Sequence, residues 1–237
     1  MNLFLQRKRI LFVNNSKVIL VVAPHADDET LGCGGTLLRF AQSGAQIHWL
    51  LVTGMLERYG YSHSQVQKRA EEISLVAQQY GFSQVHQLNF KPAALDTIPK
   101  GELISALSKI VSQVRPEEVF TAYRNDAHSD HEAVYDAVMS ATKTFRYPFV
   151  KRIYAYETIS ETDFGMKPDN CGFRPNVFIN ISNFLEKKLT ILDCFESEVG
   201  DFPFPRSRIA LESLARVRGV QSNHLAAEAF MLLKEII

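Results

Sequence analysis

Two short polar clusters contain side chains that suit metal binding and acid–base chemistry. The first is His25-Ala26-Asp27-Asp28-Glu29, and the second is Asp126-Ala127-His128-Ser129-Asp130-His131. Histidine nitrogens and carboxylate oxygens are common zinc ligands. The clusters lie about a hundred residues apart in the chain, so any joint chemistry depends on a fold that brings them together.

Together the clusters supply the donor set of a catalytic zinc site. His25 and His131 provide two imidazoles. A carboxylate comes from Asp27 or Asp28, and spacing alone does not decide between them. This set leaves one tetrahedral position for water, whose pKa falls from about 15.7 to about 7 on zinc. An aspartate that does not bind the metal then becomes a useful general base, although its own pKa is only about 3.9.

His128 is the remaining histidine of the second cluster. Its unperturbed pKa is near 6.5, and we expect the neighbouring carboxylate of Asp130 to raise it. An imidazole at this position stabilises an oxyanion or protonates a leaving amine. The inventory predicts metal-assisted hydrolysis of an amide or ester.

Each cluster alone also fits a helix N-terminus. Acidic residues favour the first turn, and Asp28 is a suitable cap. Ser129-x-x-Glu132 likewise has the form of a capping box. The occurrence of both clusters at predicted strand ends favours a functional site over two independent caps.

The elements that must position these clusters alternate between strand and helix. Residues 18–23 form a branched apolar run typical of a strand buried on both faces. Apolar runs predict strands at 18–23, 46–53, 84–90, 118–123, 152–158 and 177–181. Periodicity predicts helices at 36–42, 65–80, 103–114, 132–144, 184–196, 208–218 and 224–236. We expect Gly32, Gly34 and Gly35 to let a helix pack closely on a strand.

This alternation predicts an α/β fold with a doubly wound, mostly parallel sheet, helices on both faces and a C-terminal helical extension. With the common strand order 3-2-1-4-5, the first and fourth strands are neighbours, and the two clusters face each other across the crevice. The turn-rich segment 160–175 is predicted to be a loop or a lid. The economical interpretation is a single domain over residues 1–237.

Composition excludes several classes of protein. The chain has 26 basic and 26 acidic side chains, so no global field attracts nucleic acid. Three separated cysteines favour neither a disulfide framework nor a thiolate zinc site. Residues 1–13 carry Arg7, Lys8 and Arg9 within an apolar stretch without the features of a secretion signal, and we expect a basic N-terminal strand there. No apolar run is long enough for an integral membrane segment. We therefore expect a cytoplasmic protein.

The paired motifs resemble those of the PIG-L, or LmbE-like, zinc-dependent de-N-acetylases. The resemblance rests on residues 24–29 and 128–131, and one departure is Ala26, where the family usually has proline. It implies a Rossmann-like fold in which His25, Asp28 and His131 bind Zn²⁺. The assignment of Asp28 rather than Asp27 as the ligand rests on this resemblance.

The same resemblance implies the catalytic roles. Asp27 is the expected general base, His128 the expected oxyanion or general-acid histidine, and Asp130 an orienting residue behind them. Arg69 stands where the family often places a substrate contact, although a salt bridge to Glu72 is the alternative. The run from Pro205 to Phe230 looks like the C-terminal region of a bacterial subgroup linked with glycan biosynthesis.

The resulting hypothesis is a zinc hydrolase that removes an N-acetyl group from a small amino-sugar derivative, such as a glycan, nucleotide-sugar or lipid-linked precursor. Alternatives are a metal amidase for a non-sugar amide and a catalytically silent Rossmann-like binding module. An Fe²⁺ site is a further alternative, because two histidines and one carboxylate also form the facial triad of iron oxygenases.

Overall fold

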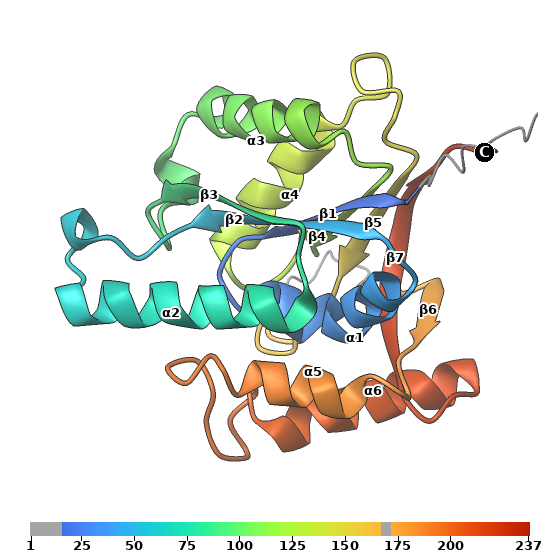
Figure 1. Ribbon diagram of the computed structural model, residues 1–237. Helices are drawn as coiled ribbons and strands as arrows, with labels where there is room; N and C mark the ends of the chain where they lie inside the picture. The colour runs from blue at the N-terminus through green and yellow to red at the C-terminus, as the bar shows by residue number, and fades with distance from the viewer. Residues whose placement is uncertain (1–15, 167–171) are drawn as a thin grey trace, which may run out of the picture.

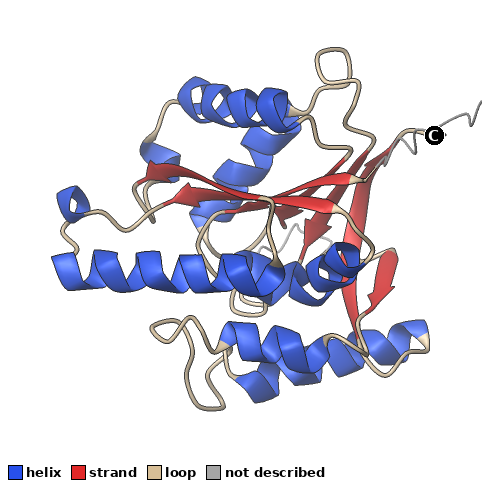
Figure 2. Ribbon diagram, in the orientation of Figure 1, coloured by secondary structure: helices blue, strands red, loops and turns tan. Residues whose placement is uncertain are grey.

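One seven-stranded sheet organises the computed structural model, which describes residues 16–166 and 172–237 (Figure 1, Figure 2). The strands follow the order β3-β2-β1-β4-β5-β7-β6. Their bounds are β1 (Val18–Ala23), β2 (Gln46–Thr53), β3 (Gln84–Phe90), β4 (Glu118–Ala122), β5 (Arg152–Tyr156), β6 (Val177–Asn180) and β7 (Ala227–Glu235). Strands β1 to β5 are parallel, whereas β7 is antiparallel to both its neighbours. The predicted fold class and the order 3-2-1-4-5 are confirmed.

Helices cover both faces of the sheet (Figure 1). Their bounds are α1 (Asp28–Gln42), α2 (His63–Tyr80), α3 (Lys100–Val114), α4 (Ser129–Ala141), α5 (Leu185–Leu192) and α6 (Arg208–Ser222), with short 3₁₀ turns η1 (Glu57–Tyr59) and η2 (Leu95–Thr97). Helices α1 and α2 lie on one face and α3 and α4 on the other, while α5 and α6 pack outside α1. None of these helices of the described ranges has the length and apolar composition of a membrane span.

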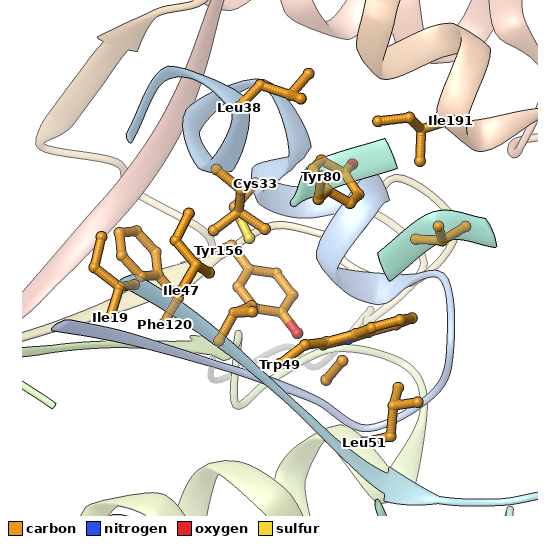
Figure 3. Close-up of a cluster of buried hydrophobic side chains, with 14 of the residues drawn as sticks. Ile19, Cys33, Leu38, Ile47, Trp49, Leu51, Tyr80, Phe120, Tyr156 and Ile191 are labelled. Carbon is orange, nitrogen blue, oxygen red and sulfur yellow. The ribbon is translucent and has the colours of Figure 1, made fainter. Parts of the chain in front are cut away.

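Strand β1 is the centre of two hydrophobic cores, which explains its unbroken apolar sequence. Val21 points towards α1 and α2. It belongs to the hydrophobic cluster of Trp49 and Tyr156, which Figure 3 shows. Leu20 and Val22 point the opposite way, towards α3 and α4. Because both faces of the strand are buried, its alternating side chains are apolar on each side.

Helix α1 begins at Asp28, eight residues before the predicted start at residue 36. Glycines disfavour helices, but here the tertiary packing requires them. A Cβ on Gly32 would lie 2.2 Å from the Tyr156 ring, and one on Gly35 would lie 2.8 Å from Ile181. The prediction that these glycines allow close packing is therefore confirmed, and it places Asp28 on the first turn.

Among the other differences from the prediction, one changes the sheet and one changes the second polar cluster. The predicted helix at 224–236 is wrong, because residues 227–235 form β7 between β5 and β6. Helix α4 covers residues 129–141 rather than 132–144, so its first turn contains part of the second polar cluster. The expected basic strand at residues 1–13, and residues 167–171 of the predicted loop, lie outside the described residues.

Candidate metal centre and its cavity

Both polar clusters lie at the carboxyl edge of the sheet, where doubly wound folds bind their ligands. His25 and Asp28 follow β1, and His128 and His131 follow the neighbouring strand β4. The ring centroid of His25 lies 4.5 Å from that of His128 and 5.5 Å from that of His131. The structure therefore confirms that the two clusters meet.

Asp28 lies between the two histidines expected to bind metal. Its Oδ2 atom is 3.2 Å from His25 Nδ1 and 3.3 Å from His131 Nε2. Ligand atoms about 2.05 Å from a tetrahedral ion lie roughly 3.3 Å from one another, so these separations fit zinc. Burial alone raises the pKa of Asp28, but the charges of His131 and His25 hold it below its usual range. Asp27 points elsewhere, into the adjoining cavity.

One ring nitrogen of His131 makes a hydrogen bond, whereas the other only faces Asp28 at 3.3 Å. Its Nδ1 atom is 2.7 Å from Asp126 Oδ2, whereas its buried Nε2 atom has no hydrogen-bond partner. Burial lowers the pKa of His131, but Asp28 and Asp126 raise it well above its usual value. An unpartnered buried polar atom costs free energy, and an ion beside Asp28 removes that cost. The residues present therefore fit a divalent metal ion.

Asp130 supports His25 as Asp126 supports His131. Its Oδ2 atom lies 3.0 Å from His25 Nε2, and its carboxylate accepts the backbone N–H groups of Ala93 and Leu95 at 2.7 and 3.0 Å. Burial lowers the pKa of His25, but hydrogen bonds to Asp130 and Asp28 raise it to about 9. Each histidine thus has a carboxylate on the ring nitrogen that is not directed at Asp28, the arrangement that orients metal-binding histidines.

A second group of side chains, His25, His128 and Asp130, is also close enough to share an ion. Its donor atoms already have partners, however. The Asp130 carboxylate contacts three nitrogen donors, and His128 Nδ1 accepts the backbone N–H of Asp130 at 3.1 Å. Within the described ranges, the group of His25, Asp28 and His131 is therefore the better metal site.

His128 is the N-cap of α4 and Ser129 is already inside the helix, so the alternative of a capping box that starts at Ser129 does not hold. Because its Nδ1 atom accepts a backbone N–H, the neutral ring carries its proton on Nε2. Burial and the charge of His25 lower the pKa of His128, with only a smaller opposing effect of Asp130. Asp130 therefore raises this pKa as expected, but burial and His25 outweigh it, and the Oδ2 atom of Asp130 contacts His25 rather than His128.

Two of the candidate metal ligands, His25 and Asp28, border a cavity of about 400 Å³ that Asp27 and His128 also line. Asp27 precedes α1, but its side chain makes no cap hydrogen bond. Burial, with the charges of Asp28 and Glu198, raises the pKa of Asp27 to about 7. A carboxyl group near this value exchanges a proton at neutral pH, which is what a general base requires.

Glu198 and Arg206, in the C-terminal half of the chain, line the same cavity. Neither residue belongs to a motif that would predict this position from the sequence. Arg206 Nε lies 3.9 Å from Asp27 Oδ2 and donates to the Glu198 backbone carbonyl at 2.7 Å. Both side chains come from the segment between α5 and α6. Asp126 belonged to the second cluster, but only the fold shows that it contacts His131.

Arg69 lines the cavity and is also held by several partners. Its Nη1 atom donates to the Ala26 carbonyl at 2.9 Å, and its Nη2 atom contacts Ser197 and Glu198. Its Nε atom lies 3.2 Å from Glu72 Oε2, so the alternative salt bridge is present. Arg69 therefore holds the backbone of Ala26 in place, between His25 and Asp27. Residue 26 is the position at which the family usually has proline.

The described part of the turn-rich loop is attached to the second cluster. Glu161 accepts the Ala127 backbone N–H at 3.1 Å through its carbonyl, and Thr162 Oγ1 donates to Asp126 Oδ1 at 2.7 Å. A Cβ on Gly165 would lie 2.3 Å from the Asn125 carbonyl oxygen. Ser160 and Glu161 of this segment line the cavity, and Thr162 lies behind Asp126.

Comparisons with known proteins agree with this geometry. The model of the PIG-L family, described as GlcNAc-PI de-N-acetylase, matches residues 20–142, which include both polar clusters. Uncharacterized deacetylase YaiS from Escherichia coli (strain K12) is 32% identical over 62% of this chain and 77% of its own. Diacetylchitobiose deacetylase from Thermococcus kodakarensis is 25% identical over 94% of this chain and 85% of its own.

A solved structure extends the likeness to the fold. The N,N'-diacetylchitobiose deacetylase from Pyrococcus horikoshii superposes with a TM-score of 0.75 at 20% identity, and the match covers 93% of this chain and 85% of that one. The family model and the E. coli relative, taken with the paired clusters, are decisive for the family. The chain belongs to the PIG-L family.

Proposed function

We propose that this chain is a zinc-dependent amide hydrolase that removes the acetyl group from an N-acetylated amino sugar. One observation carries the proposal: two carboxylate-supported histidines and Asp28 converge beside a cavity that a second aspartate and a third histidine also line. The sugar class is supported by the similarity to a diacetylchitobiose deacetylase.

The ion would be held by His25 Nδ1, Asp28 Oδ2 and His131 Nε2. When bound, zinc would lower the pKa of a water molecule to near neutrality, and the ion would also polarise the acetyl carbonyl. Asp126 and Asp130 keep the two imidazoles oriented from the opposite ring nitrogens. Fe²⁺ suits the same donors, so metal analysis is part of the test.

Asp27 is the proposed proton carrier. Its carboxylate accepts a proton from the attacking water and returns it to the nitrogen of the leaving amine, as the amide C–N bond breaks. Because the pKa of Asp27 is about 7, its carboxyl group can both accept and release a proton at neutral pH. Arg206, 3.9 Å away, orients the carboxylate that accepts the proton.

His128 is the proposed oxyanion donor. Its Nε2–H group is the free donor of a neutral ring whose Nδ1 atom is occupied by the Asp130 backbone. A fixed donor aimed at the acetyl oxygen stabilises the negative charge that develops there. Arg69 adds a substrate contact through the Nη1 hydrogen that Ala26 does not use.

The experiment is acetate release from a panel of N-acetylated sugars and non-sugar amides, with the purified protein, a chelator and added Zn²⁺ or Fe²⁺. We expect release from amino sugars, its loss with chelator and its recovery with zinc. Asp27→Asn should retain zinc and lose most turnover. Release from non-sugar amides alone supports the amidase alternative, oxygen consumption with iron supports an oxygenase, and zinc binding without turnover supports a binding module.

A further inference from the structure

The cavity beside the candidate metal centre has one apolar side. Six side chains form it, and we call them the apolar wall: Met55, Leu56, Tyr61, Val66, Ala70 and Ile73. They come from the loop after β2 and from the first half of α2. Asp27 and His128 line the same cavity, so whatever covers the wall shares the cavity with the reacting groups.

Most of the apolar wall does not belong to the protein core. Ile73 packs against the hydrophobic cluster around Trp49, but the other five residues join none of the three clusters found among the described residues. Leu56, Val66 and Ile73 are partly buried, and Ala70 is exposed. Contiguous apolar surface that the core does not use is typical of a ligand site.

Helix α2 explains how this surface arises. Val66, Ala70 and Ile73 stand at i, i+4 and i+7, which places them on one helix face. In the second half of the helix, Val76 and Tyr80 are buried in the core under the sheet. The first half extends beyond the ends of the strands (Figure 1), so its apolar face meets the cavity instead of the sheet.

A monosaccharide alone is a poor partner for this surface, because its hydroxyl groups lose their water partners against hydrocarbon. We propose that the substrate is an N-acylated amino sugar with an apolar substituent, and that this substituent packs on the apolar wall while the amide reaches Asp27 and His128. The inference rests on the proposed function. The hydrocarbon belongs either to a group linked at the anomeric carbon or to a longer N-acyl chain.

The test measures kcat/KM of the zinc-loaded protein in two series of substrates. One series lengthens the alkyl aglycone of N-acetylglucosamine from methyl to octyl, and the other lengthens the N-acyl chain of methyl glucosaminide from acetyl to hexanoyl. A buried CH₂ group contributes about 0.8 kcal/mol, roughly fourfold in kcat/KM. We expect an increase of at least about tenfold along one series, which also identifies the source of the hydrocarbon.

A matched pair of variants locates the effect. Val66→Thr keeps the side-chain shape but places a hydroxyl on the wall, and we expect it to reduce the preference for the longer substrate about fivefold. The control is Val217→Thr, an identical change at an exposed position of α6 away from the cavity, which should leave that preference unchanged.

Flat kcat/KM values along both series, with the shortest substrates hydrolysed, would overturn this inference and leave the proposed function intact. Equal loss of preference in both variants would overturn it as well. If no member of either series is hydrolysed, the proposed function is itself wrong.

Discussion

Asp126→Asn tests whether the carboxylate behind His131 contributes to metal binding. The native Oδ2 atom is 2.7 Å from His131 Nδ1, and Oδ1 accepts the Thr162 hydroxyl at 2.7 Å. Asparagine has nearly the same shape, and its amide oxygen still accepts the imidazole N–H. The variant therefore removes the negative charge but keeps the orientation of the ring. Loss of such a carboxylate typically costs 10–100-fold in metal affinity, or about 1.4–2.7 kcal/mol.

The assay is competition for zinc between metal-free protein and a chromophoric chelator. Asp136→Asn is the control, because this aspartate also lies on α4 but pairs with Arg124 at the surface. We expect a Kd for zinc that is 10–100-fold higher in Asp126→Asn and unchanged in the control. Native circular dichroism together with an unchanged Kd in Asp126→Asn would refute the role of this carboxylate.

Three further variants test separate parts of the account. His128→Ala should lower kcat about 10²–10³-fold while stoichiometric zinc remains bound, and loss of zinc would contradict an oxyanion role. Asp27 is ordinarily ionised above pH 3.8 but here has a pKa of about 7, so its burial destabilises the fold increasingly as pH rises between these values. Metal-free Asp27→Asn should therefore be more stable than the native protein in urea at pH 8, by at most roughly 4 kcal/mol, and less so at pH 5. Gly32→Ala should destabilise by roughly 1–3 kcal/mol because its Cβ meets Tyr156, whereas Gly101→Ala, with open space around it, should not.

The central parallel strands β1, β2 and β4 were predictable because hydrophobic burial determines their sequence. The run at residues 18–23 is apolar on both faces, and only a central strand requires this. Once the strand order was assigned, the carboxyl ends of β1 and β4 had to lie together. The meeting of His25 and His131 follows from that topology rather than from any local signal.

The errors occur where long-range packing overrides local preference. Residues 227–235 are rich in alanine, leucine, glutamate and lysine, which favour helices, yet pairing with β5 and β6 makes them a strand. The start of α1 was missed for the converse reason. Glycine weakens an isolated helix, but Gly32 is required where the helix crosses Tyr156.

The candidate site was predictable in its motifs but not in its supporting contacts. Residue types and family resemblance indicated His25, Asp28 and His131. The partner of each histidine depended on side-chain geometry, so Asp130 was assigned to His128 although it contacts His25. Arg206 was not found because the segment that carries it is separated from both clusters in sequence and reaches the cavity only through the packing of α5 and α6.

The most direct test of the central claim is an anomalous difference map of zinc-soaked crystals, recorded on both sides of the zinc absorption edge. We predict one strong peak about 2.0–2.2 Å from His25 Nδ1, Asp28 Oδ2 and His131 Nε2. A peak between His128 and Asp130, or no peak in the cavity at full zinc loading, would contradict the proposed metal centre.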